Sequence, residues 1–135
     1  MRALEKRYGR TQALAGVDLD VGEGELFGLL ETLAETIALA RALGFDPQRF
    51  LDTITGGALD FPYAHLKGKA MIDEEFPPSF AARLARKDAN LALAAARAEG
   101  LELPLVEAVA RQFERTVDLG HGDEDLAAVV LTLTR

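Results

Sequence analysis

The sequence predicts a mainly helical protein with a β-hairpin at its N-terminal end. Apolar residues alternate with polar residues over part of residues 13–30, which is a strand pattern, whereas after Glu31 they recur every three or four residues, which is a helix pattern. With 135 residues, 49% of them hydrophobic, the chain can bury a core without disulfide or metal crosslinks. We therefore expect a hairpin part, residues 1–30, and a helical part, residues 31–135.

The predicted hairpin occupies residues 13–30. The alternating segment Val17–Val21 predicts one strand, Gly22–Gly24 predicts the turn, and the apolar run Leu26–Leu30 predicts the second strand. Because an isolated two-stranded hairpin is marginally stable, we expect it to be an appendage of the helices.

Glycine and proline divide the remaining residues into helices, since they favour helix ends and helix starts respectively. Side chains of Asp46, Asp60, Ser79 and Asp123 are predicted to accept hydrogen bonds at helix N-termini. The predicted helices cover residues 32–43 before Gly44, 47–55 before Gly56–Gly57, a short segment after Asp60, the longest helix at 80–98 before Gly100, 104–119 before Gly120, and 126–132.

The helix at 104–119 shows why these segments should pack together. One of its faces is apolar and the other charged, so burial of the apolar face is expected to contribute about 1.5–3 kcal/mol per large side chain. The apolar positions are Leu105, Val109, Phe113 and Val117.

Two charged residues conflict with the pattern of the helix at 80–98. Lys87 falls on the apolar stripe of Phe80, Leu84 and Leu91, and Asp88 lies among alanines. Burying a charge is costly unless it is paired. Either these residues serve a ligand or partner, or Lys87 extends to solvent while Asp88 bonds a neighbouring helix terminus.

Composition argues against several function classes. The net charge of -7 disfavours nucleic acid and anionic membranes as partners, and the absence of cysteine excludes disulfides and thiolate chemistry. No apolar run approaches the ~20 residues that span a bilayer, and no export signal opens the chain. We therefore expect a soluble cytoplasmic protein.

Other polar candidates have ordinary structural interpretations. His121, Asp123 and Asp125 could suggest a metal, but carboxylates just before a helix more often bond its free amides, so we predict no metal site. Gly56–Gly57 fits a helix end better than a ligand approach, and His65 is expected at the surface.

Three runs, in this order, carry a resemblance to a known family: Phe80–Ala92 (FAARLARKDANLA), Gly100–Pro104 (GLELP) and Gly120–Val129 (GHGDEDLAAV). From about Glu31 to Val130 the chain resembles the β-hydroxyacid dehydrogenases, which include 3-hydroxyisobutyrate dehydrogenases and tartronate semialdehyde reductases. The resemblance implies the helical C-terminal domain of the 6-phosphogluconate dehydrogenase-like type. It also implies a homodimer, with NAD or NADP as cofactor and a small 3-hydroxy acid as substrate.

Site residues follow only from that resemblance. It makes Lys87 the lysine that approaches the nicotinamide cofactor across the domain cleft, with Phe80 and Asp88 as structural residues near the cleft. No G-x-G-x-x-G motif for a dinucleotide occurs in the sequence. The catalytic lysine of the family, in a G-x-x-x-K-x-x-N-N motif, would fall at Leu19. The setting of Lys6 does not match that motif.

We therefore assign no catalytic residue and expect no tight cofactor binding. The chain is interpreted as a partial NAD(P)-dependent dehydrogenase, inactive alone. The alternatives are a self-associating helical module without catalysis and a subunit that completes a separately encoded dehydrogenase.

Residues 4–30 carry a second resemblance, to the start of an ABC-transporter ATP-binding protein. It rests on Leu4–Gly9, Ala13–Val21 and Gly24–Leu30, and it implies that Tyr8 would stack on adenine. In that family the phosphate-binding loop follows directly, but here the sequence continues Glu31-Thr-Leu-Ala. We therefore expect no ATPase activity, and a junction between two unrelated pieces at Leu30–Glu31.

Overall fold

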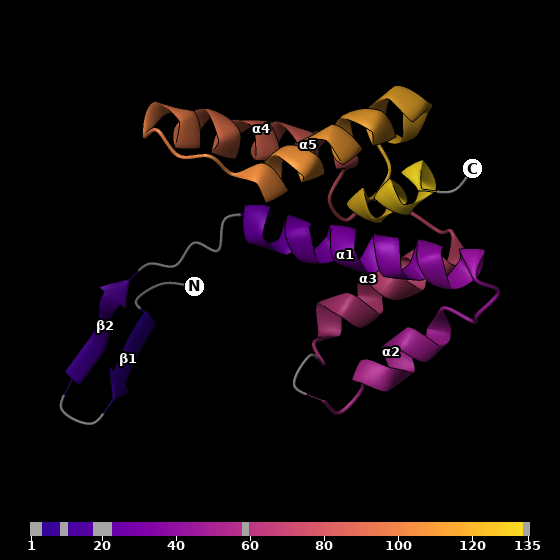
Figure 1. The fold of residues 1–135 in the computed structure, drawn as a ribbon, viewed down its shortest axis with the longest axis horizontal. Coiled ribbons are helices and arrows are strands. Elements are labelled where there is room, and N and C mark those ends of the chain that lie inside the picture. Colours follow the sequence, from indigo (N-terminus) through magenta and orange to yellow (C-terminus); the bar gives the residue numbers. More distant parts are fainter. Residues whose placement is uncertain (1–3, 9–10, 18–22, 58–59, 134–135) are drawn as a thin grey trace.

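The computed structural model describes residues 4–8, 11–17, 23–57 and 60–133. A two-stranded hairpin precedes a cluster of helices, as Figure 1 shows. The elements are β1 (Leu4–Tyr8), β2 (Thr11–Val17), α1 (Glu23–Ala42), α2 (Gln48–Ile54), α3 (Pro62–Asp73), α4 (Ala82–Ala98), α5 (Pro104–Thr116), the π-helical turn η1 (Val117–His121) and the 3₁₀ helix η2 (Leu126–Thr132).

The N-terminal hairpin is present, but its strands differ from the predicted ones. β1 and β2 pair antiparallel, with Leu4 opposite Val17 and Tyr8 opposite Thr11, and Figure 1 shows them standing away from the helices. The predicted second strand, Leu26–Leu30, is wrong because these residues belong to α1. Most of the predicted first strand, and Gly22 of the predicted turn, lie outside the described residues.

α1 is the central helix of the domain. It packs against α3, α4, α5 and η2. Its buried side follows a helical period that begins before Glu31, which explains why the apolar run at 26–30 is helical rather than extended. The predicted division at Leu30–Glu31 falls inside this helix. The buried apolar residues of α1 are Leu30, Leu33, Ala34 and Ile37.

The end of α1 and both ends of α2 lie within one residue of the predicted boundaries, although the N-cap of α2 is Pro47 rather than Asp46. Gly44 has a φ of 76°, a conformation that glycine adopts without strain. Asp46 accepts a hydrogen bond from the Gln48 amide at 2.9 Å, as expected for a residue preceding a helix. Arg41 then joins α1 to the end of α3, because its Nη2 donates to the carbonyls of Met71 and Ile72 at 3.0 and 2.8 Å.

α3 is longer than the short helix predicted, and Asp60 does not cap it. Phe61 is at the N-cap, while the Asp60 carboxylate accepts from the Gly56 amide at 2.7 Å and contacts His65. The carboxylate therefore stabilises the turn after α2. α2 and α3 pack closely at Gly68, where a Cβ would lie 2.8 Å from Leu51 Cδ2.

α4 differs from its prediction in three respects. It is shorter than α1, with 17 residues against 20, and its N-cap is Ala81 rather than Ser79. Its buried side is not the stripe through Phe80 and Leu91, since Leu91 is 60% exposed. Apart from Leu93, the buried residues are alanines, which allow neighbouring helices to approach closely: Ala82, Ala85, Ala89 and Ala96.

α5 places Val109 and Phe113 in the core as predicted, but Leu105 is 62% exposed and Val117 half-buried. The positions beside Val109 and Phe113, Ala110 and Thr116, are buried instead. Gly120, with a φ of 95°, ends the helical segment. A stripe with one residue in every four drifts around the helix, because a helical turn has 3.6 residues. The buried face of α5 therefore includes only the middle two of the four predicted apolar positions.

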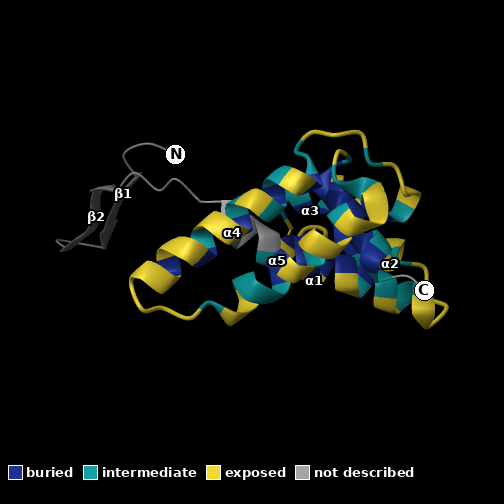
Figure 2. Cartoon of the chain, turned by 90° about the horizontal axis from the view of Figure 1, so that it is seen from above, coloured by how far each residue is buried: buried dark blue, intermediate teal, exposed yellow. Residues whose placement is uncertain are grey.

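η2 occupies the predicted range 126–132, although Asp125 and not Asp123 caps it. The Asp125 carboxylate accepts from the Ala127 amide at 3.0 Å. Nearly all of η2 is buried between α1, α3, α4 and α5, as expected for a segment without a polar face. Figure 2 shows buried residues gathered where these helices meet, and an exposed connection from α4 to α5.

Among the described helices, none is both long and apolar enough to cross a membrane.

Candidate functional site

Lys87 lies on the exposed side of α4. Its side chain is 60% exposed, and its Nζ lies 3.1 Å from Asp88 Oδ1. The Asp88 side chain is 22% exposed, so this pair sits at the edge of the buried face rather than within it. Lys87 therefore does not interrupt the core, and its charge faces outward.

A shallow hollow of about 470 Å³ lies beside Lys87 between α4 and α5. Its walls also include Arg86, Asn90, Leu91 and Glu114. Arg86 is held by Glu114, with Nη1 3.2 Å from Oε1. A molecule placed against this surface would meet the Lys87 ammonium and the Asn90 amide, which suits an anionic or amide-bearing group.

Phe80, the third predicted residue, lies two turns before Lys87 and is not gathered with it. Phe80 packs partly buried against the core. Its amide is 3.3 Å from Asp125 Oδ2, and its carbonyl accepts from the Leu126 amide at 2.9 Å. The structure therefore brings Lys87 and Asp88 together and assigns Phe80 to the junction of α4 with η2.

That junction contains a buried ion pair that the sequence analysis missed. Lys67 Nζ lies 2.8 and 2.9 Å from the two oxygens of Asp125, and it also donates to Ser79 Oγ at 2.9 Å. The Ser79 hydroxyl and amide both donate to Asp125 Oδ2, at 2.7 and 3.1 Å. Lys67 also lies over the Tyr63 ring, 5.4 Å from its centroid.

The pKa of Asp125 reflects these contacts. Burial alone would raise it, but hydrogen bonds from Lys67, the Ala127 amide and Ser79 outweigh burial and hold the pKa below its usual value. The carboxylate thus stays charged and joins three segments. The signal in the sequence was the helical spacing of Ala64, Gly68 and Met71, which places Lys67 on the buried side of α3.

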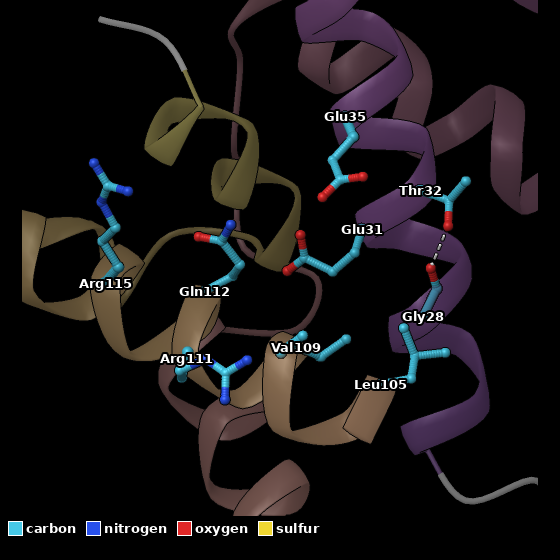
Figure 3. Close-up of a pocket in the computed structure, with 10 residues that line it drawn as sticks. Gly28, Glu31, Thr32, Glu35, Leu105, Val109, Arg111, Gln112 and Arg115 are labelled. Atoms are coloured by element: carbon cyan, nitrogen blue, oxygen red, sulfur yellow. Dashed lines mark hydrogen bonds between the residues drawn. The ribbon is translucent and has the colours of Figure 1, made fainter. Parts of the chain in front are cut away.

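A second buried ionisable side chain, that of Glu31, lines a hollow of about 310 Å³ between α1 and α5, drawn in Figure 3. Glu31 is only 6% exposed, and neither carboxyl oxygen has a hydrogen-bond partner among the described residues. Burial, and next the charge of Glu35, raise the pKa of Glu31 to about 8. The sequence pattern did not identify Glu31, because the first helix was predicted to begin at Thr32, whereas α1 begins at Glu23 and contains Glu31.

The side chains considered as metal ligands have separate partners. His121 Nδ1 lies 3.0 Å from Glu124 Oε2, Asp123 pairs with Arg83 at 2.6 Å, and Asp125 binds Lys67. Over the described residues, no three His, Cys, Asp or Glu side chains are grouped to hold a metal ion.

The other two candidates also have structural partners. Gly56 has a φ of 74° just after α2, which confirms the helix-end interpretation of Gly56–Gly57. His65 Nε2 lies 2.7 Å from Asp60 Oδ1, and the His65 ring is 35% exposed.

Comparison with known proteins places this geometry in a family. Residues 26–133 match the family model described as NAD-binding of NADP-dependent 3-hydroxyisobutyrate dehydrogenase. The match begins before Glu31 and covers every described helix except the first residues of α1.

Individual relatives agree. The chain is 35% identical to an uncharacterized oxidoreductase, YfjR, of Bacillus subtilis, covering 78% of this chain and 37% of that protein. It is 32% identical to 2-hydroxy-3-oxopropionate reductase of Escherichia coli, covering 77% and 36%. A crystal structure of 3-hydroxyisobutyrate dehydrogenase from Salmonella typhimurium superposes with a TM-score of 0.75 at 26% identity, covering 87% and 41%.

The chain thus spans well under half the length of these relatives. The order of its helices, the match over residues 26–133 and the similarity to solved dehydrogenases together assign it. This chain belongs to the β-hydroxyacid dehydrogenase family, and it corresponds to the helical domain of the 3-hydroxyisobutyrate dehydrogenases.

Proposed function

We propose that this chain supplies the helical, cofactor-facing part of an NAD(P)-dependent dehydrogenase for small 3-hydroxy acids, and that it does not catalyse alone. The relatives named as 2-hydroxy-3-oxopropionate reductase and 3-hydroxyisobutyrate dehydrogenase support this substrate class. Because the chain corresponds to only part of each relative, we propose that turnover needs the nucleotide-binding function of the part that this chain does not match.

The observation that carries this proposal is the position of Lys87. Its ammonium is exposed beside the shallow hollow between α4 and α5, and among the ion pairs of the described residues Lys87 takes part in one, with its neighbour Asp88. By contrast, Arg83 and Arg86 on the same helix are held by Asp123 and Glu114 on other segments. Lys87 thus has no evident role in holding helices together, and its charge is available to a molecule that docks on α4.

In the described ranges, the chain lacks the unit that holds the pyrophosphate of a dinucleotide. Binding of pyrophosphate in this class of cofactor uses a parallel strand, a glycine-rich turn and a helix N-terminus. The described strands instead form one antiparallel pair, and no such strand–turn–helix unit occurs in the described ranges. NAD(P), when bound to the assembled enzyme, carries the hydride. In this chain Lys87 would hold a positive charge at the edge of the cleft.

Cofactor titration tests whether this chain binds NAD(P) alone or only together with a nucleotide-binding domain. We expect NADH and NADPH, titrated into the chain alone to millimolar concentration, to leave its melting temperature unchanged, because a ligand stabilises only the state that it binds. A separately produced nucleotide-binding half of a relative should bind NADPH more tightly when the chain is added. Saturable binding by the chain alone, or no effect of adding it, would contradict the proposal.

A self-associating module is the second candidate, and the end of α1 favours it. Leu39, Leu43 and Phe45 are 60, 62 and 61% exposed, which is unusual for large apolar side chains so close together. A second copy covering them would give a homodimer without catalysis. Light scattering at high micromolar concentration tests this directly, since a monomer would exclude the module.

We further propose that the residues before the family match, which begins at residue 26, are a truncated start of an ABC-type ATP-binding protein, joined to the dehydrogenase part within α1. The resemblance over residues 4–30 and the switch to Glu31-Thr-Leu-Ala support it. DNA reads spanning the codons of Leu30 and Glu31 test whether the junction exists in the genome. If no read joins the two codons, the two pieces are not encoded as one chain and the proposed junction is refuted.

A further inference from the structure

We infer that the hollow between α1 and α5 binds a small zwitterion, with Glu31 and Glu35 facing its ammonium group and Arg111 and Arg115 facing its carboxylate. This site is separate from Lys87, which lines a different hollow on α4. It goes beyond the proposed function and does not depend on it.

Glu31 is the first reason. Its carboxyl oxygens are covered and lack a hydrogen-bond partner among the described residues, which is a costly arrangement for a polar group. Figure 3 shows the side chain running from α1 toward α5, with its carboxyl in the space between the two helices. A hydrogen-bond donor that enters this space would remove the free-energy cost of the unpaired carboxyl oxygens. A protonated amine has three N–H donors.

The distribution of charge is the second reason. The α1 wall of the hollow carries Glu31 and Glu35, and the α5 wall carries Arg111 and Arg115. In the described part of the chain, no ion pair is formed by any of these four side chains. Two carboxyl groups, of which that of Glu31 is protonated at pH 7, thus line one wall, and two guanidinium groups line the other without forming an ion pair with them. A ligand with one positive and one negative group complements both walls.

The size and polarity of the hollow set the ligand class. Its volume of about 310 Å³ is at the lower end for small-molecule sites, which run from roughly 300 to 1,000 Å³. Leu105 and Val109 provide the apolar lining, and the Thr32 hydroxyl is already bonded to the Gly28 carbonyl at 2.9 Å. An amino acid with a short carbon chain fits these limits.

Access to Glu31 requires only a local movement. The terminal torsion of glutamate is broad, so rotation about it can shift the two covered carboxyl oxygens while the other torsions keep their staggered conformations. Glu35 and Arg111 are exposed at the rim and can attract the ligand before that movement.

Ligand binding should also change the protonation of Glu31. With a pKa of about 8 the carboxyl carries a proton at pH 7, and an ammonium placed beside it favours the ionised form. The other charged groups facing it are Glu35 on α1 and Arg111 and Arg115 on α5, whereas η2 contributes no titratable side chain. Binding at pH 7 is therefore expected to release a proton.

Isothermal titration of the full chain with three compounds of equal carbon number tests the inference. β-Alanine carries both charges, propylamine only the positive one and propionate only the negative one. We expect saturable millimolar binding of β-alanine and binding at least about tenfold weaker for the other two, since each loses one charged contact. Equal binding of propylamine and β-alanine, or no binding of β-alanine, would overturn the inference.

Variants locate the site. Glu31→Gln should weaken β-alanine about tenfold, whereas Glu102→Gln, an exposed change outside the hollow, should leave the affinity unchanged. Amide chemical shifts in NMR spectra of both variants, recorded without ligand, verify folding. The heat of β-alanine binding, measured in two buffers of different ionisation enthalpy, gives the number of protons released on binding. Undiminished affinity in Glu31→Gln, or no proton release in the natural chain at pH 7, would contradict the assigned role of Glu31.

Discussion

Lys67 Nζ lies 2.8 Å from Asp125 Oδ1, joining two buried residues 58 positions apart in the chain. This contact fixes α3 to the start of η2, and Ser79 adds the segment before α4. The family resemblance pointed to Lys87, but the lysine that organises the helices is Lys67.

Removing one partner of this pair should be strongly destabilising. We expect Lys67→Met to lower the free energy of unfolding by about 3–5 kcal/mol, because Asp125 would remain buried without its counter-charge. Urea unfolding followed by circular dichroism measures this value. Lys69→Met is the matched control, since Lys69 is 74% exposed and its pairing with Asp73 is at the surface. Comparable losses in both variants would contradict a special role for the buried pair.

The same pair predicts acid sensitivity. The lowered pKa of Asp125 means that its stabilising contribution is present above the ordinary value of 3.8 and is lost as the pH falls through the lower folded pKa. Unfolding measured from pH 6 downward should therefore show a steeper loss of stability in the natural chain than in Asp125→Asn. If the stability of the two proteins falls equally with pH, Asp125 is not the group whose protonation destabilises the fold.

Glu31 predicts the opposite dependence on pH. Its pKa rises from 4.5 in the unfolded chain to about 8 in the folded domain, so the folded state binds more protons between these values. Stability should fall as the pH rises from about 4.5 to 8 and then level off.

Melting temperatures of Glu31→Gln and the natural chain, compared at pH 5 and pH 8 without ligand, test this. The variant should gain relative stability at pH 8, because it does not have to ionise. The exposed substitution Glu102→Gln should show no such trend. A constant difference between Glu31→Gln and the natural chain across this range would exclude the raised pKa.

The buried face of α5 predicts unequal effects of two similar truncations. Phe113 is fully buried, so Phe113→Ala should cost about 3–5 kcal/mol of unfolding free energy. Leu105 is 62% exposed, and Leu105→Ala should cost less than about 1 kcal/mol. Chemical denaturation measures the unfolding free energy of both variants. Similar losses in the two would support the apolar stripe predicted from the sequence, in which both residues are buried, and would contradict the structure.

If the exposed end of α1 forms a dimer, a charge placed there should prevent it. We expect Leu43→Glu to give a monomer in sedimentation velocity at concentrations where the natural chain is dimeric. Leu101→Glu is the control, because Leu101 is equally exposed at 59% but lies in the connection from α4 to α5. A dimer that survives Leu43→Glu must use another surface.

Helix existence was predictable from the sequence because glycine and proline mark the breaks. The ends at Gly44, Gly56, Gly100 and Gly120 all have positive φ, which local residue chemistry alone determines. The predicted strand at Leu26–Leu30 was wrong because a short apolar run fits a buried helix as well as a strand, and Leu30 of this run belongs to the core formed by the helices.

Caps and site residues were less predictable because they depend on distant segments. Asp123 suits the start of η2 by local sequence, yet Asp125 caps this helix. Asp125 is held at that position by Lys67 and by the Ser79 amide, which lie far away in the sequence. Similarly, Glu31 resembles a solvated charge until α5 covers it. Lys87 stood out in the sequence as a charge on a predicted apolar stripe, and the family resemblance alone gave it a role toward the cofactor. In the structure it lies exposed on α4.

The most direct test of the central proposal is the turnover of a reconstituted enzyme. The natural chain, mixed with a separately produced nucleotide-binding half of a relative, is assayed with NADPH and 2-hydroxy-3-oxopropionate. We predict activity that neither part shows alone, strongly reduced by Lys87→Met and retained by the exposed control Lys69→Met. Full activity of the mixture containing Lys87→Met would contradict the role assigned to Lys87, and an inactive mixture with the natural chain would contradict the proposed function.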